Sequence, residues 1–306
     1  MSDLLIGTSG YDYPEWKGVF YPEDLKRKDF LSYYATQFNA LELNNTFYNM
    51  PTAERLLSFY ERSEGRLNFS VKANRLLTHE IGADWQVAAG DFKTALTPLQ
   101  EKDSLSAVLF QLPESFHYTK DNRIYLAKLI QEFEGFPVMV EFRHKEWIRE
   151  SVFEGLEKRK AGIVFCDMPQ LKNLPDGTVM GTPFIGSNAY IRLHGRNEGA
   201  WYAAGESLNG SARYCYDYSD EELAQFVPII KAARGEGKKV QVYFNNHPNG
   251  SGAKNGLKLK EMIGMDESGE KYKKSYNYRF DFYDSIMIRL VLTNGKTKKN
   301  LREKRC

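Results

Sequence analysis

The chain has 306 residues, of which 42% are hydrophobic and 14% aromatic, so it can bury one barrel-sized core or two ordinary ones. No apolar run approaches the roughly 20 residues that span a bilayer, and the start "MSDLLIGTSG" has neither a basic nor an apolar leader pattern, which predicts a cytoplasmic protein without a membrane partner. Three widely spaced cysteines, Cys166, Cys215 and Cys306, indicate neither a disulfide framework nor a metal clamp, and we interpret them as buried or idle thiols.

Apolar runs of strand length alternate with helix-compatible segments along most of the chain. The segments between them carry apolar residues at three- and four-residue spacing, which predicts parallel strands joined by crossover helices. The exception is "QLKNLPDGTVMGTPFIGS", which is typical of a loop. Ser219 and Glu222 have the spacing of a helix capping box. The expected strands are 4–10, 40–48, 67–74, 105–113, 137–145, 162–169, 188–195 and 238–247.

Eight such units predict an α/β fold, a TIM-like (β/α)8 barrel that forms a single domain over residues 1–264. The main alternative is an open doubly wound sheet. A dinucleotide-binding sheet of that kind needs GxGxxG after its first strand, and "GTSGYDYPEW" does not supply it.

Residues 265–306 have a different composition and are predicted to be a basic C-terminal tail. From Lys271 to Cys306 there are eleven Lys or Arg against three Asp or Glu, whereas the whole chain has a net charge of only +2. The remainder of the chain is therefore acidic. Such a tail is either a solvated end or a segment that contacts phosphate groups.

Every expected strand ends on a polar or charged residue. In a barrel of this type the carboxyl ends of the strands meet at one face, which carries the active site. We therefore predict a pocket at this face. The residues that form it are Glu42 and Asn44, Lys72, Gln111, Glu141 and Arg143, Asp167, Arg192 and His194, and Asn245 and Asn246.

Residues two apart on a strand share a face, so Glu141 points the same way as Arg143, and Arg192 the same way as His194. Charges that point into a barrel are costly unless they are paired. One interpretation is a polar pocket for a ligand. The other is a structural network of ion pairs, Glu141 with Arg192 or Arg143, that closes the barrel.

Several motifs together resemble a known family. They are "IGTSGYDYPEWKGVFYP", "LELNNTFYNMP", "FSVKANRLLTH", "LFQLPESF", "VEFRHKEW", "CDMP", "YIRLHGR" and "YFNNHPNGSGAKNG". In this order and spacing, over about residues 3–264, they resemble the YecE-like family (domain of unknown function 72). The resemblance implies a TIM-barrel fold and a pocket, and it implies no particular reaction. Residues after about 270 lie outside the family pattern.

The predicted pocket is rich in cations. Lys72, Arg143, Arg192 and Arg196 favour a small anionic ligand, because ammonium and guanidinium groups match phosphate and carboxylate. Further substrate contacts are predicted for Asn44, Gln111, Tyr202, Asn245 and Asn246. His194 is the main candidate for acid–base catalysis, with His144 as a second imidazole. Glu42, Glu141 and Asp167 are candidate bases or groups that orient a histidine.

These residues predict an enzyme of hydrolase or isomerase type that acts on a phosphorylated or nucleotide-like small molecule. A metal-assisted variant uses Glu141, Asp167 and His194 to hold Mn²⁺, Mg²⁺ or Zn²⁺. No HxH or HxxEH spacing supports this metal site, so any cofactor stays unassigned. Neither the reaction nor the oligomeric state follows from the sequence.

The alternative is a non-catalytic module that binds nucleic acid. Residues 195–218 interleave basic and aromatic side chains, and the basic tail adds positive charge. Packing, or a cover over the pocket, explains the same segment equally well. The acidic balance of the first 270 residues argues against a dedicated nucleic-acid binder. The aromatic residues concerned are Trp201, Tyr202, Tyr214, Tyr216 and Tyr218.

Overall fold

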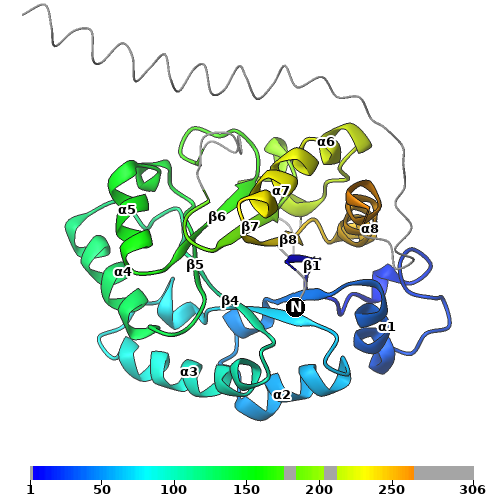
Figure 1. Cartoon of the computed structure of the whole chain (residues 1–306), viewed down its shortest axis with the longest axis horizontal. Coiled ribbons are helices and arrows are strands. Elements are labelled where there is room, and N and C mark those ends of the chain that lie inside the picture. Colours follow the sequence, from blue (N-terminus) through cyan, green and yellow to red (C-terminus); the bar gives the residue numbers. More distant parts are fainter. Residues whose placement is uncertain (1–2, 176–183, 203–211, 265–306) are drawn as a thin grey trace, which may run out of the picture. The chain divides into compact units, whose positions relative to one another are not determined.

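The eight predicted strands form one closed parallel barrel, and each strand pairs with its neighbours in sequence (Figure 1). This computed structural model describes residues 3–175, 184–202 and 212–264, which belong to one compact unit, Met1–Met265. The predicted barrel is confirmed, and the predicted basic tail lies outside the described residues. The strands are β1 (Leu4–Ser9), β2 (Ala40–Leu43), β3 (Asn68–Lys72), β4 (Leu105–Gln111), β5 (Val138–Glu141), β6 (Gly162–Asp167), β7 (Asn188–Leu193) and β8 (Lys239–Phe244).

The α-helices surround the barrel and join successive strands (Figure 1). Thr52 and Thr119 cap the first turns of two of them, and Ser219 with Glu222 forms the predicted capping box of a third. Between β6 and β7 the described residues 168–175 and 184–187 contain no α-helix, as the sequence indicated. The helices are α1 (Phe30–Gln37), α2 (Ala53–Arg62), α3 (Trp85–Glu101), α4 (Lys120–Glu132), α5 (Glu150–Lys158), α6 (Asp220–Ala224), α7 (Phe226–Gly235) and α8 (Ser251–Ile263).

Alternation along the strands divides the core into two layers. Each fully buried Leu, Ile or Val contributes about 1.5–3 kcal/mol relative to an exposed one, so both layers stabilise the barrel. One layer lies between the strands and the helices and includes Ile6, Leu41, Val108, Val140 and Ile163. The other layer fills the barrel itself and includes Leu5, Ala40, Leu109, Met139 and Val164.

Gly7 lets β1 and β2 approach each other closely. A Cβ atom on Gly7 would lie 2.0 Å from the carbonyl oxygen of Ala40. The Tyr34 hydroxyl of α1 occupies the same region, where it donates to Ala40 O at 2.9 Å and accepts from Thr8 N at 2.8 Å. The missing side chain therefore allows a helix to hydrogen-bond directly to the edge between two strands.

The pairing of β5 with β6 is short. It consists of two register pairs, Met139 with Gly162 and Val140 with Ile163, whereas β4–β5 and β6–β7 have four pairs each. Beyond Val140 the two strands are no longer paired. The carboxyl end of the barrel is therefore more open between β5 and β6 than on either side.

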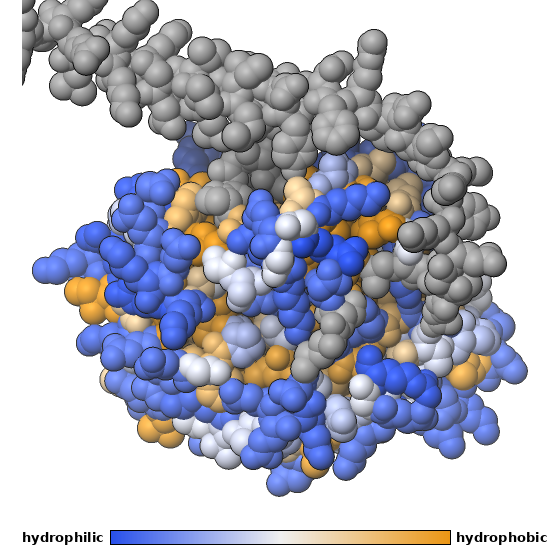
Figure 2. Space-filling view, viewed as in Figure 1, coloured by the Kyte–Doolittle hydropathy of each residue, from blue (hydrophilic) through white to orange (hydrophobic). Residues whose placement is uncertain are grey.

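The outer surface is mostly hydrophilic, with hydrophobic side chains scattered among the polar ones on the face that Figure 2 shows. This pattern is normal for helices that bury one side against a barrel. In the part of the chain that the structure describes, no helix combines the length and hydropathy needed to cross a membrane.

Candidate active site

Polar side chains that face the inside of the barrel gather at the carboxyl ends of its strands. Alternation decides which residues take part, because side chains two apart share a face. Most of them are fully or almost fully buried. The predicted residues in this inward set are Glu42, Lys72, Gln111, Glu141, Arg143, Arg192, His194 and Asn245, and Ser9 and Cys166 join them.

Arg192 lies at the centre of a buried ion-pair network. Its Nη1 donates to Glu141 Oε2 at 2.5 Å and its Nη2 donates to Glu42 Oε1 at 2.6 Å. Glu42 also accepts from Ser9 Oγ at 2.5 Å and from the Tyr190 hydroxyl at 2.7 Å. Burial opposes the charge on Arg192, but Glu141 and Glu42 hold its pKa well above the usual value. Arg192 therefore stays cationic and joins β7 to β5 and β2.

Arg143 connects this network to His194. It donates from Nε to Glu141 Oε1, and its Nη2 lies 3.0 Å from His194 Nε2. A guanidinium can only donate, so Nε2 of His194 is the acceptor and Nδ1 carries the proton. Nδ1 faces the side-chain amide of Asn245 at 2.9 Å, and an amide rotated to present its oxygen accepts this proton.

The charge states of Glu141 and His194 follow from these neighbours. Burial acts to raise the pKa of Glu141, but Arg143 and Arg192 lie so close that its pKa falls far below the usual value. Burial, with the charges of Arg143 and Arg192, holds the pKa of His194 well below its usual value. Glu141 is therefore an anion and His194 is neutral, with its one lone pair engaged by Arg143.

These contacts match the ion-pair interpretation of the sequence. Two carboxylates, Glu42 and Glu141, balance two guanidinium groups, Arg143 and Arg192, so the four residues carry no net charge. The two arginines are less available to an external anion than the sequence suggested. His194 becomes a free base only if Arg143 releases its Nε2.

Lys72 is an inward-facing cation that this network leaves without a carboxylate partner. Its Nζ donates to Gln111 Oε1 at 2.8 Å and lies 4.3 Å from the centre of the Phe47 ring. Among the described residues no carboxylate oxygen forms a salt bridge with it within 4.0 Å. Burial, followed by the charge of Arg192, lowers the pKa of Lys72 to about 7, and the residue is still partly exposed. At neutral pH a large fraction of Lys72 is therefore a free amine that solvent can reach.

Comparison with known proteins agrees with this barrel. The profile described as "Protein of unknown function DUF72" matches residues 5–277. The chain belongs to the DUF72 family. It is 28% identical to the UPF0759 protein YunF of Bacillus subtilis over 276 residues, which are 87% of this chain and 96% of that protein.

Solved structures of the DUF72 family share the fold. The chain is similar to a DUF72 family protein from Thermotoga maritima, with 34% identity, a TM-score of 0.74, and coverage of 85% of this chain and 99% of that one. It is also similar to a DUF72 family protein from Enterococcus faecalis, with 23% identity, a TM-score of 0.73, and coverage of 86% and 96%. The resemblance stated from the motifs is therefore confirmed.

Asp167 and Arg196 do not join the inward set of this DUF72 family member. Asp167 follows Cys166 on β6, so its side chain takes the opposite face of the strand. It accepts from the Tyr218 hydroxyl at 2.6 Å and pairs with Arg196, which also contacts Glu222. Burial raises the pKa of Asp167 although Arg196 acts against this. The expected grouping of Asp167 with Glu141 and His194 is therefore wrong in position.

The predicted asparagines lie in different environments. Asn245 faces His194, as described above. Asn246, one residue later, points away and donates to Tyr216 O at 2.9 Å and Asn255 Oδ1 at 2.8 Å, so it fixes the loop after β7 against α8. Asn44 lies just after β2 and is half-buried. Only Asn245 of these three contacts the inward set directly.

Buried polar atoms without a hydrogen-bond partner concentrate at the same face. Buried polar groups are normally paired, so each exception calls for an explanation. All five in the described part of the chain lie on β7 or in the loops at the carboxyl ends of β2, β7 and β8. Such atoms occur where a bound polar molecule would supply the missing partners. They are Asn44 Oδ1, Arg192 Nε, Arg213 Nε, Asn246 Oδ1 and His247 Nδ1.

Two aromatic residues in the described part of the segment 195–218 are buried. Trp201 is 3% exposed, and its ring lies 5.6 Å from the guanidinium carbon of Arg143 and 6.4 Å from the His194 ring. Tyr218 is buried through its contact with Asp167. Tyr202 is 59% exposed and donates to Glu114 at 3.4 Å. Among the described aromatic residues of this segment it is the only exposed one.

A metal ion does not fit the inward set. Donor atoms of Glu141, Cys166 and His194 lie within 4.8 Å of one another. However, the guanidinium groups of Arg143 and Arg192 already occupy both oxygens of Glu141 and the free nitrogen of His194. Burial, and then Glu141, raises the pKa of Cys166 well above its usual value, so its thiol is protonated and a poor ligand.

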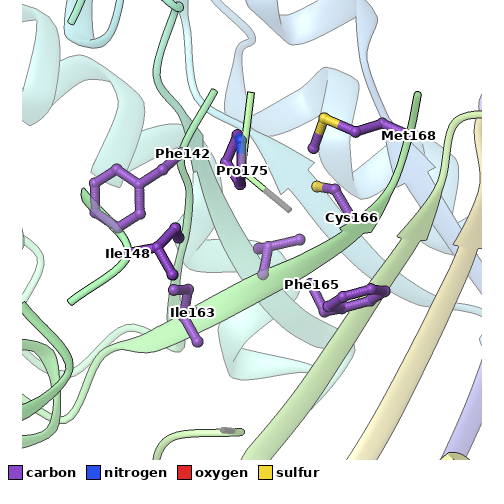
Figure 3. Close-up of a pocket in the computed structure, with 8 residues that line it drawn as sticks. Phe142, Ile148, Ile163, Phe165, Cys166, Met168 and Pro175 are labelled. Atoms are coloured by element: carbon purple, nitrogen blue, oxygen red, sulfur yellow. The ribbon is translucent and has the colours of Figure 1, made fainter. Parts of the chain in front are cut away.

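Cys166 also borders a small apolar pocket (Figure 3). The pocket lies where β5 and β6 stop pairing, and the sulfur atoms of Cys166 and Met168 face it together with Phe142 and Pro175. Its free volume is about 10 Å³, which is room for roughly one water molecule. It is too small for a substrate.

Sequence reasoning missed three residues of the site. Ser9 lies at the end of the first expected strand without a predicted role, and Cys166 is expected only to be a buried or idle thiol. Tyr190 is not connected to the pocket, although it contacts Glu42. Trp201 belongs to the segment expected either to pack or to cover the pocket, and its ring lies near Arg143. Alternation would have found Tyr190, two residues before Arg192, and Cys166, beside the outward Asp167.

Proposed function

We propose that this protein is an enzyme that acts on a small anionic substrate by proton transfer, with Lys72 as the group that accepts the proton. The observation that carries the proposal is the state of Lys72. It is a partly exposed lysine at the carboxyl end of a barrel strand, with a pKa of about 7 and no carboxylate partner among the described residues. Acid–base catalysis is most efficient when the pKa of the catalytic group lies near the working pH.

The surroundings of Lys72 support an anionic substrate. The ion pairs of Arg143 and Arg192 balance, so a bound anion would not have to break Glu141 from Arg192, and it would be stabilised by the positive charge that Lys72 gains on accepting the proton. Arg192 Nε and Asn44 Oδ1 offer unpaired polar atoms for orientation. Gln111 and Phe47 hold the Lys72 amine in place. Lys72 in its amine form would then remove a proton from the substrate or from an attacking water.

Two other functions have weaker support. The metal-assisted route needs Glu141, Asp167 and His194 together, but the side chain of Asp167 lies on the other face of β6. Nucleic-acid binding through the segment 195–218 has weaker support because Trp201 and Tyr218 are buried, so their rings are not available to stack on bases. The basic tail lies outside the described residues and adds no support to either function.

The test is a thermal-stability screen with phosphorylated and carboxylated metabolites at pH 7.5. Wild type is compared with Lys72→Met and with Lys239→Met. Lys239 is a matched control, because it is a half-buried strand lysine whose pKa burial also lowers, but it begins β8 at the opposite end of the barrel. We expect one compound class to raise the melting temperature of wild type and Lys239→Met, but not of Lys72→Met.

Turnover of the compound class found in this way provides the second readout. For Lys72→Met we expect a loss of about 10²–10⁴-fold, the range for removal of a general acid or base. The rate of wild type should rise with pH through about 7, as the Lys72 amine forms. An unchanged rate in Lys72→Met would rule out this role, and so would a panel in which no anion stabilises wild type.

A further inference from the structure

Three potential metal ligands converge on the outer part of the barrel's carboxyl face. His117 lies in the loop after β4, and His144 and Glu146 lie in the loop after β5. Glu146 Oε2 lies 3.5 Å from His117 Nδ1 and 3.6 Å from His144 Nδ1, and one donor atom from each residue lies within 4.8 Å of the other two. The two imidazole rings meet edge to face at 4.6 Å.

The cluster presents electron-rich donor atoms that no lysine or arginine side chain among the described residues neutralises. The backbone N–H of Glu146 donates to His144 Nδ1 at 3.3 Å, so this nitrogen carries a lone pair and no proton. It nevertheless faces the carboxylate of Glu146. No Lys or Arg side chain pairs with that carboxylate among the described residues, and the Tyr118 N–H reaches it at 3.2 Å. The lone pair of His144 Nδ1 thus faces the carboxylate, whose other neighbours are the Tyr118 N–H and the His117 ring.

Two of the three donor separations are those of a metal site, and the third is within 4.8 Å. Zinc bonds of about 2.0–2.1 Å to nitrogen and oxygen place tetrahedral ligands about 3.4 Å apart. The two separations from Glu146 Oε2, 3.5 and 3.6 Å, are close to this value and longer than an ordinary hydrogen bond. We propose that His117, His144 and Glu146 bind a divalent transition-metal ion, Zn²⁺ or a similar ion that accepts imidazole and carboxylate ligands.

The burial of the three side chains suits such a site. The His144 side chain is 7% exposed and held in place, whereas His117 is 55% and Glu146 45% exposed. His144 gives up its long bond from the Glu146 N–H when it binds the ion. Three protein ligands leave the fourth position to water, which is the arrangement of zinc sites that activate water. The ion would also tie the loop after β4 to the loop after β5.

This site differs from the group formed by Glu141, Cys166 and His194. There, arginine side chains already neutralise the donor atoms, and the Cys166 thiol is buried. At the outer cluster, no arginine or lysine forms a salt bridge with the Glu146 carboxylate, within the described residues. The two groups also differ in chemistry, because only the inner one contains sulfur. A spectroscopic probe can therefore distinguish them.

The experiment titrates untagged, metal-free protein with Co²⁺ and then with Zn²⁺. We expect one Co²⁺ per chain with the visible absorption of a tetrahedral nitrogen–oxygen site and no sulfur charge-transfer band, and we expect Zn²⁺ to displace it. His117→Ala and Glu146→Gln should each weaken binding about tenfold or more, at least the effect of losing a group that supports a ligand. Both residues are exposed, so these variants should still fold, and circular dichroism checks this.

Two variants act as controls. His79→Ala removes an exposed histidine of another loop and should bind Co²⁺ like wild type. Cys166→Ala should also bind like wild type. A sulfur band that disappears in Cys166→Ala would assign the metal to the inner group and overturn the proposal. Binding that is unchanged in His117→Ala and Glu146→Gln, or absent from wild type, would overturn it as well.

Discussion

Arg192 on β7 donates a 2.6 Å hydrogen bond to Glu42 on β2, which lies 150 residues earlier in the chain. Both side chains are almost inaccessible to solvent. A buried pair of this kind costs desolvation energy when it forms, and losing one partner leaves a buried charge unpaired. The pair therefore matters more to the integrity of the barrel than to the capture of an external anion.

Replacing Arg192 should make the barrel easier to unfold. For Arg192→Met we expect the free energy of unfolding to fall by about 3–5 kcal/mol, because Glu42 and Glu141 both lose a buried partner. Urea denaturation measures this loss. Arg196→Met is the matched control, since Arg196 is about one-third exposed and should cost less. A loss in Arg192→Met no larger than in Arg196→Met would contradict the central role of Arg192.

Lys72 should make stability depend on pH in the alkaline range. Its pKa falls from 10.5 in the unfolded chain to about 7 in the folded barrel, so the unfolded chain binds the proton more tightly. Its contribution to stability is fully present above pH 10.5, is lost as the pH falls towards 7, and stays constant below that. Between pH 7.5 and 9.5, wild type should therefore gain stability.

Lys72→Met should remove this dependence and be more stable than wild type at pH 7.5. Urea denaturation at both pH values measures the difference, and Lys120→Met, an exposed lysine at the start of α4, controls for general effects of pH. Equal slopes for Lys72→Met and wild type would mean that the Lys72 amine keeps its ordinary pKa. A lysine that destabilises its own fold fits the proposed role, because activity and stability commonly conflict at a catalytic site.

Cys166 should be chemically silent in the folded protein. Its thiol is buried, and burial with the neighbouring Glu141 raises its pKa. A thiol reagent at pH 8 should modify exposed Cys215 in the native protein and reach Cys166 only after denaturation. Mass spectrometry of the peptides identifies each product. Rapid labelling of Cys166 in native protein would mean that the interface between β5 and β6 opens readily.

Tyr218 and Asp167 should act on stability and not on ligand binding. Tyr218→Phe removes a 2.6 Å bond to buried Asp167 and leaves the Gly195 N–H without its acceptor, so we expect a loss of about 1–3 kcal/mol. Tyr202→Phe, which removes an exposed hydroxyl, should change stability by less than about 0.5 kcal/mol. A changed ligand response at unchanged stability in Tyr218→Phe would return Asp167 to the active site.

The barrel could be predicted from the sequence because its signals are local and repeated. All eight strands fall inside the expected ranges, and the capping box at Ser219 forms as expected. The carboxyl-end residues were also found, since each strand of a parallel barrel must end at the same face. The roles of Glu141 and Arg192 were less predictable, because pairing across the barrel depends on distances that no local pattern contains.

The remaining errors have physical causes. Asp167 was placed in the pocket because it ends a strand, but strand alternation gives the inward position to Cys166. Asn246 was misplaced in the same way beside Asn245. The lowered pKa of Lys72 arises from burial and from the charge of Arg192, so it depends on tertiary structure and not on the residues around Lys72 in sequence.

The interface between β5 and β6 has few backbone hydrogen bonds, because the pairing of these two strands is short. β6 lies between β5 and β7, so the salt bridge from Arg192 on β7 to Glu141 on β5 connects the two sides of this interface. Amide protons beyond Val140 and Ile163 should exchange with solvent sooner than those elsewhere in the sheet, because opening there breaks the fewest bonds. Arg192 thus links the strands on both sides of the interface where backbone pairing is weakest.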